Sequence, residues 1–80
     1  MIKRLSICEG DPGFEAWKEL REKKIKITLD GFEQFMVMTV DAEQGWLRRF
    51  ICDEKGIMKM LGTQFATEVL KGKVEISFYD

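Results

Sequence analysis

The stretch "KIKITLDGFEQFMVMTV", residues 24–40, decides the fold class because its first apolar residues follow a period of two. Between Ile25 and Leu29 apolar residues alternate with Lys and Thr, which predicts a half-buried strand. Asp30-Gly31 is a dipeptide favoured in hairpin turns, and the β-rich run after it predicts a long returning strand from Phe32 to Val40. The stretch therefore indicates antiparallel sheet.

Upstream of this stretch, residues 12–23 are predicted to form a helix. Asp11 can accept a hydrogen bond from an unpaired amide as the N-cap, and Pro12 fits the first helical position because no amide hydrogen is needed there. The apolar stripe of this helix consists of Phe14, Trp17 and Leu20. A Pro-Gly turn that joins two strands is the competing interpretation of residues 11–13.

Further strands are predicted on both sides of these elements. Polar turns at 41–45 and 53–56 enclose a strand at 46–52, whose Arg48 and Arg49 point to opposite faces. In the segment 57–70, the apolar residues Ile57, Leu61, Phe65 and Val69 would also fit one face of a helix. Gly62-Thr63 and the β-branched residues of the segment instead favour two short strands there. The remaining strands are expected at 2–8, 57–61, 64–70 and 74–78.

These elements predict a single α+β domain that spans residues 1–80. Its strand-rich part, 24–80, is expected to form an antiparallel meander of five or six strands, with the amphipathic helix packed on one face. A small, partly open β-barrel is the alternative. A core this small supplies only a few kcal/mol of net stability, so self-association is a further expectation.

The acidic segment from Val40 to Gly56 does not match a metal loop. As a calcium loop starting at Asp41, it has Gly45 at the fifth position where the sixth is required, and Cys52 where a bidentate Glu belongs. Zinc lacks a convincing ligand set in a chain without His. Asp41 and Glu43 are expected to lie in a solvated turn, which predicts no metal, no cofactor and no enzymatic activity.

Charge and cysteine content restrict the partners and the setting. Thirteen basic and fourteen acidic side chains give a net charge of −1, so neither duplex nucleic acid nor an anionic membrane is an expected partner. No segment resembles a signal peptide or a membrane span, which favours the cytoplasm. Cys8 and Cys52 are expected to be free buried thiols, and a disulfide between them is the alternative.

A weak basic patch supports the second functional hypothesis, which is binding of single-stranded nucleic acid. Its five cations are diluted by three Glu residues, which leaves five minus three, or +2. Aromatic residues between basic ones could stack bases, although no recognition-module signature is present. The patch consists of Lys18, Arg21, Lys23, Lys24 and Lys26.

The favoured hypothesis is a non-catalytic module that binds a protein through a sheet edge or a Met and aromatic face. Met side chains suit adaptable protein contacts, although in a small core they also fill gaps. Aromatic residues near the ends of elements could anchor an interface or cover the core. The candidate interface residues are Met36, Met38, Met58, Met60, Trp46 and Tyr79.

The order of three motifs resembles small uncharacterised proteins of tailed bacteriophages and prophages. The motifs are "KIKITLDG", "DAEQGWLRRFICDEKG" and "ATEVLKGKVEI", and together they span about residues 24–76. They describe strands and turns, so the resemblance implies a phage or prophage origin and carries no catalytic residues. It implies that the partner is a virion protein or a host defence or regulatory protein in the bacterial cytoplasm.

Overall fold

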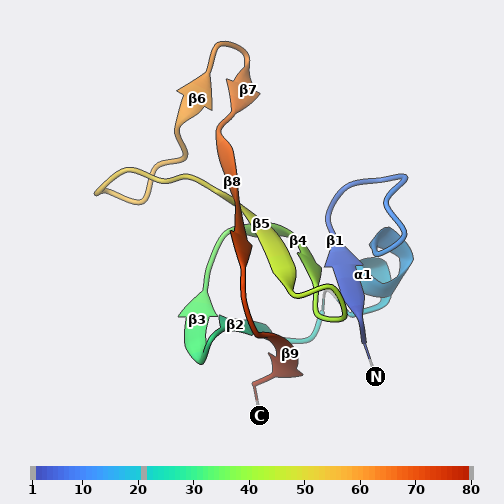
Figure 1. Cartoon of the computed structure of the whole chain (residues 1–80). Coiled ribbons are helices and arrows are strands. Elements are labelled where there is room, and N and C mark those ends of the chain that lie inside the picture. Colours follow the sequence, from blue (N-terminus) through green and yellow to red (C-terminus); the bar gives the residue numbers. More distant parts are fainter. Residues whose placement is uncertain (1, 21, 80) are drawn as a thin grey trace.

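The computed structural model describes residues 2–20 and 22–79, and this part of the chain forms one helix and nine strands. A four-stranded sheet has the order β1-β4-β5-β8, a three-stranded sheet β3-β2-β9, and β6 pairs with β7 (Figure 1). Every pairing is antiparallel, and the described strands close no barrel, so the α+β prediction is confirmed. The elements are β1 (Arg4–Ser6), α1 (Phe14–Leu20), β2 (Ile25–Leu29), β3 (Phe32–Gln34), β4 (Val37–Asp41), β5 (Trp46–Phe50), β6 (Met60–Leu61), β7 (Gln64–Phe65), β8 (Thr67–Lys71) and β9 (Val74–Phe78).

The predicted hairpin at Asp30-Gly31 is confirmed. Asp30 and Gly31 have φ values of 51° and 86°, and Leu29 pairs with Phe32 across the turn. A tight hairpin turn needs positive φ at both central residues, and Asp and Gly tolerate that conformation better than other residues do.

The predicted strand from Phe32 to Val40 is wrong, because the chain breaks into β3 and β4 there. Met36 has a φ of 58°, which turns the chain out of the three-stranded sheet and into the four-stranded one. Its carbonyl accepts a hydrogen bond from the amide of Phe50 at 2.9 Å, which holds the turn. No Gly or Pro marks the break in the sequence, so propensity alone predicts an unbroken strand.

Helix α1 is shorter than predicted and begins two residues later. The carbonyl of Gly13 accepts the first helical hydrogen bond, from the amide of Trp17 at 3.1 Å, whereas the carbonyl of Asp11 accepts from the amide of Phe14 at 3.0 Å in the turn before the helix. The Asp11 carboxylate instead accepts from the amide of Gly13 and from Arg4, so it shapes the turn before the helix. The helix lies against β1, and Trp17 packs on the core as expected.

The core lies where the two larger sheets face each other. Leu5, Val40, Leu47 and Val74 are buried there, and half-buried side chains from β2, α1 and β9 surround them. Beside this cluster, the hydroxyls of Ser6 and Thr39 form a buried hydrogen bond of 2.9 Å. The packing is that of a small domain with few fully buried side chains.

Strand β8 belongs to the four-stranded sheet and β9 to the three-stranded sheet, and the chain passes from one to the other at Gly72. The turn at Gly72 is hydrogen-bonded to the turn after β4 and to the turn after β2, and these three turns are called the clasp. The amide of Gly72 donates to the carbonyl of Gly45 at 3.0 Å. The amide of Lys73 donates to Oδ1 of Asp30 at 2.8 Å, and the amide of Asp30 donates back to the carbonyl of Lys73 at 2.8 Å.

The segment 57–70 forms strands, not a helix. It contains β6, β7 and most of β8, and the hairpin β6–β7 turns at Gly62-Thr63. The strand predicted at 46–52 ends at Phe50, and Cys52 makes only an isolated bridge to Met58.

Candidate functional site

A cluster of charged side chains closes the acidic turn after β4. Arg4 donates from Nε and Nη2 to Asp11 at 2.8 and 2.7 Å, and from Nη1 to Asp41 at 3.0 Å. Its guanidinium also lies 5.1 Å from the centre of the Trp46 ring. The prediction that Asp41 is solvated is wrong, because Asp41 is buried; Glu43 is exposed. The reason is strand register, since Arg4 lies directly opposite Asp41.

Within this cluster, the contact with Arg4 favours the ionised form of Asp11. Hydrogen bonds from Arg4, and a further one from the amide of Gly13, lower the pKa of Asp11 to about 2, while Asp11 raises the pKa of Arg4. A carboxylate held ionised by two or more donors is a poor general acid or base near neutral pH. The hydrogen bonds of Arg4 to Asp11 and Asp41 stabilise the two turns that they join.

The second acidic turn, 53–56, is held by the carboxylate of Asp53. Oδ1 of Asp53 accepts from the amides of Lys55 and Ile57 at 2.8 and 3.0 Å. Among residues 2–20 and 22–79, no three His, Cys, Asp or Glu side chains are grouped so that they could hold a metal ion. Asp53 is thus used to form the turn.

Residues 51–66, called the arm below, leave the four-stranded sheet between β5 and β8. Figure 1 shows the hairpin β6–β7 projecting away from α1 and from the three-stranded sheet. Three backbone hydrogen bonds of 2.8 to 2.9 Å close the base of the arm, from Ile51 to Ala66, from Lys59 to Ile51 and from Ala66 to Lys59. The arm is therefore attached through its base while its hairpin extends outward.

The surface of the arm is rich in exposed apolar side chains. Leu61 is 72% exposed, and all four strand residues of the β6–β7 hairpin are exposed. These side chains make up the exposed apolar surface of the arm. Its large apolar residues are Ile57, Met60, Leu61 and Phe65, with exposed Val69 on the adjoining β8.

A groove of about 530 Å³ runs between the arm and the outer face of the four-stranded sheet. The rings of Phe50 and Phe65 meet edge to face in it, with centres 5.9 Å apart. Arg48 donates from Nη1 to the hydroxyl of Thr67 at 3.2 Å, which places its charge in the groove. The groove is lined by Met38, Arg48, Phe50, Thr63, Gln64, Phe65 and Thr67.

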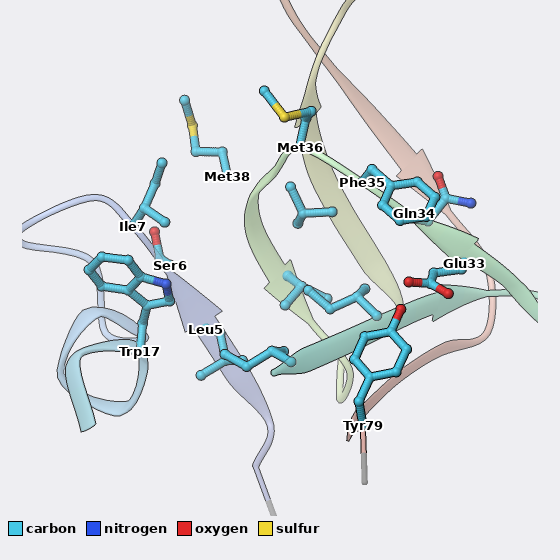
Figure 2. A pocket seen from close by; sticks show the side chains of 14 residues that line it. Leu5, Ser6, Ile7, Trp17, Glu33, Gln34, Phe35, Met36, Met38 and Tyr79 are labelled. Atoms are coloured by element: carbon cyan, nitrogen blue, oxygen red, sulfur yellow. The ribbon is translucent and has the colours of Figure 1, made fainter. Parts of the chain in front are cut away.

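A separate pocket of about 320 Å³ opens beside the core. Figure 2 shows Trp17 and Ile7 on one side of it and Tyr79 and Glu33 on the other. Its floor is apolar, with contributions from Leu5 and Val40 among others. Met38 lines both this pocket and the groove, so the two hollows lie close together.

The predicted interface residues are divided among different places. Met36, Met38 and Tyr79 line the pocket, whereas Met58 and Met60 belong to the arm, with Met58 half-buried. Trp46 is half-buried beneath Arg4, and it neither lines the pocket nor belongs to the arm.

Sequence reasoning did not single out Ile57, Leu61 or Phe65, which carry most of the apolar surface of the arm. The signal that could have found them is the close spacing of the two turns, 53–56 and 62–63. Ile57 and Leu61 lie between these two turns, and Phe65 follows shortly after the second one, so all three belong to a short excursion of the chain.

The predicted basic patch is only partly assembled. Nζ of Lys18 pairs with Glu15 at 3.3 Å, on the helix. Nζ of Lys23 lies 5.7 Å from the Phe78 ring centre, and Nζ of Lys26 lies 5.8 Å from that of Tyr79. Lys24 is exposed directly before β2, and its carbonyl accepts a hydrogen bond from the amide of Tyr79, which follows β9. Arg21 lies outside the described residues.

Cys8 and Cys52 are free, as expected, but half-buried rather than buried.

No helix within 2–20 and 22–79 is long and apolar enough to cross a membrane. No protein-family model, no curated protein and no solved structure matches the chain.

Proposed function

We propose that the chain is a non-catalytic module that binds a partner protein through the apolar surface of the arm. The observation that carries this proposal is the exposure of Leu61, Ile57, Met60 and Phe65 on the arm, whose hairpin projects from the domain. A hairpin that buries none of its strand residues gains little from folding alone, because isolated two-stranded hairpins are marginal in water. A partner that covers these side chains supplies the missing burial.

The size of the apolar contribution is adequate for binding. Each Leu, Ile or Phe side chain that a partner buries fully contributes about 1.5–3 kcal/mol. The charges of the arm cancel, since Asp53 and Glu54 are matched by Lys55 and Lys59, two against two. A neutral apolar surface suits a protein partner better than a polyanion, whose binding depends on several cations.

The resemblance to phage and prophage proteins supports a particular kind of partner. On this proposal the module acts in the cytoplasm of an infected bacterium and binds a virion protein, or a host defence or regulatory protein that it antagonises. Self-association through the same arm is a further form of protein contact, and sedimentation of the purified chain measures it.

The test compares two equally exposed apolar residues. Leu61 lies on the arm, and Phe32, 74% exposed, lies on β3 outside it. The wild-type chain, Leu61→Asp and Phe32→Asp are each immobilised and exposed to bacterial lysate, and the retained proteins are quantified. We expect Leu61→Asp to lower retention of a specific partner about tenfold or more, since central contacts carry most binding energy. Phe32→Asp should retain the same partner as the wild type.

Equal retention by all three chains would contradict the proposal, as would retention lost only in Phe32→Asp. Thermal unfolding of each variant is measured alongside, because both residues are so exposed that neither substitution should lower the melting temperature.

Binding of single-stranded nucleic acid is the second candidate, favoured by the stacking of Lys23 on Phe78 and of Lys26 on Tyr79. Aromatic rings beside cations on a sheet can stack bases and hold the phosphate backbone. Fluorescence anisotropy with labelled oligo(dT) separates the two functions. Binding that weakens with salt and with Tyr79→Ala, but not with Leu61→Asp, would favour this second candidate.

A further inference from the structure

The groove beside the arm combines one cation with aromatic and apolar side chains. Side chains on one face of an antiparallel sheet alternate along each strand, so Arg48, Phe50 and Thr67 share the outer face. Thr67 lies directly opposite Phe50 in the register of β5 and β8. Phe65 closes the groove from the arm side through its edge-to-face contact with Phe50.

Arg48 is the charged residue of this groove. Its guanidinium has five N–H donors, and the hydroxyl of Thr67 takes one of them at 3.2 Å. No carboxylate of residues 2–20 or 22–79 lies within 4.0 Å of it, in contrast to Arg4 and Arg49, which both have carboxylate partners. The Thr67 contact fixes the position of the cation and leaves further donors available.

The surroundings of Arg48 are apolar and aromatic. Phe50, Phe65 and Met38 line the groove with it, and Val69, its direct partner on β8, is exposed beside it. A guanidinium set among apolar side chains binds a carboxylate well, because the partner's apolar groups exclude water from the ion pair.

We propose that the partner of the arm presents an acidic, apolar segment, with an Asp or Glu carboxylate on Arg48 and an adjacent apolar side chain packed against the rings of Phe50 and Phe65. This inference rests on the proposed function and specifies the partner's chemistry at the same site. A carboxylate fits better than a nucleic-acid backbone, because the groove supplies one cation and the arm has no net charge.

The test uses three labelled hexapeptides in which Leu alternates with Glu, with Gln or with Lys. Binding of each peptide to the full chain is measured by fluorescence anisotropy. The Glu peptide is expected to bind most tightly and the Lys peptide least. Arg48→Gln should weaken the Glu peptide about tenfold or more, since charge-assisted hydrogen bonds are lost. Arg48→Lys keeps the charge but not the forked N–H donors of Arg, so its affinity for the Glu peptide should lie between those of the wild type and Arg48→Gln.

The matched control is Lys71→Gln, which removes an exposed cation from the same sheet outside the groove and should leave binding unchanged. The inference is overturned if the Glu peptide does not bind at about 1 mM, a level that weak specific contacts reach. Equal binding of the Gln peptide, an unaltered affinity in Arg48→Gln, or displacement of the Glu peptide by oligo(dT) would also overturn it. The proposed function is judged separately: arm-dependent capture of a protein that persists in Arg48→Gln leaves that function standing and removes only this inference.

Discussion

At the scale of single residues, two glycines before the helix serve different purposes. A Cβ placed on Gly13 would lie 2.9 Å from both the carbonyl carbon and the Cα of Leu5, which are backbone atoms that cannot move aside cheaply. A Cβ on Gly10 would meet nothing within 4 Å, but its φ of 91° is unfavourable for other residues. Gly13 thus permits close packing of the turn on β1, whereas Gly10 permits a backbone conformation.

Substitution of each glycine separates these two effects. Gly13→Ala is expected to lower the free energy of unfolding by about 2–3 kcal/mol, because the added methyl forces β1 and the turn apart. Gly10→Ala should cost about 1 kcal/mol, from backbone strain alone. Urea denaturation of both variants checks the order, and equal losses would show that the contact with Leu5 is not limiting.

The pKa of Asp11 gives a pH dependence with a definite sign. Its ordinary pKa of 3.8 is lowered to about 2 in the folded chain, chiefly by Arg4, so folding favours the ionised form. The stabilisation is fully present above about pH 4 and is lost as the pH falls toward 2. Asp11→Asn should therefore lower stability near neutral pH by roughly 1–2 kcal/mol and flatten the acid limb of the stability curve. Denaturation at a series of pH values measures this, and exposed Glu9→Gln serves as the control.

At the scale of elements, local patterns and long-range pairings differ in how well the sequence predicts them. The hairpin at Asp30-Gly31 and the position of the helix follow from turn chemistry and periodicity, which are local. The pairing of Arg4 with Asp41 joins residues 37 positions apart, so no local pattern could reveal that Asp41 is buried. The break at Met36 depends on a positive φ, which is uncommon for a residue other than Gly and has no local sequence signal here.

The apolar protein interface stays a prediction, and of the residues predicted for it only Met58 and Met60 lie on the arm. An apolar protein-binding surface was expected, and Met60 is part of the arm. Leu61 and Phe65 were assigned to strands that could have been covered by others, and only the projection of the hairpin leaves them exposed. Arg48 was expected on a strand face, but its place in the groove depends on Thr67, which pairs with β5 from a distant part of the chain.

The hairpin β6–β7 should be dispensable for folding. The amide of Ala66 bonds to the carbonyl of Lys59 at 2.9 Å, so an Asn-Gly turn can replace residues 60–65 between two positions already in contact. The free energy of unfolding of the shortened chain should be lower by at most about 1.5 kcal/mol, mainly because the edge-to-face contact of Phe65 with Phe50 is lost. Urea denaturation measures the loss. A much larger loss, or failure to fold, would mean that the hairpin belongs to the core, and the proposed role of the arm would have to be abandoned.

At the scale of the whole molecule, the clasp around Gly72 is what makes two sheets into one folding unit. Strand β8 belongs to one sheet and β9 to the other, and the turn between them is bonded to the turn after β2 and to the turn after β4. A Cβ on Gly72 would approach the Asp30 carboxylate to 2.7 Å, so the two turns are in close contact. The core at the sheet interface depends on this arrangement, because Leu5 and Val74 come from different sheets.

Asp30→Ala should therefore destabilise both sheets together. The substitution removes the acceptor for the Lys73 amide and places Ala at a φ of 51°, for a combined cost of about 1–2 kcal/mol. Native-state hydrogen exchange should show the same loss of protection in β4 and in β9, because opening the clasp exposes the shared core. Asp30→Asn keeps an acceptor and tolerates the turn, so it should recover most of the loss. Asp53→Ala removes a similar carboxylate from the arm and should affect only amides of the arm. If Asp30→Ala lowers protection in the β2–β3 hairpin alone, the sheets open independently and the clasp does not couple them.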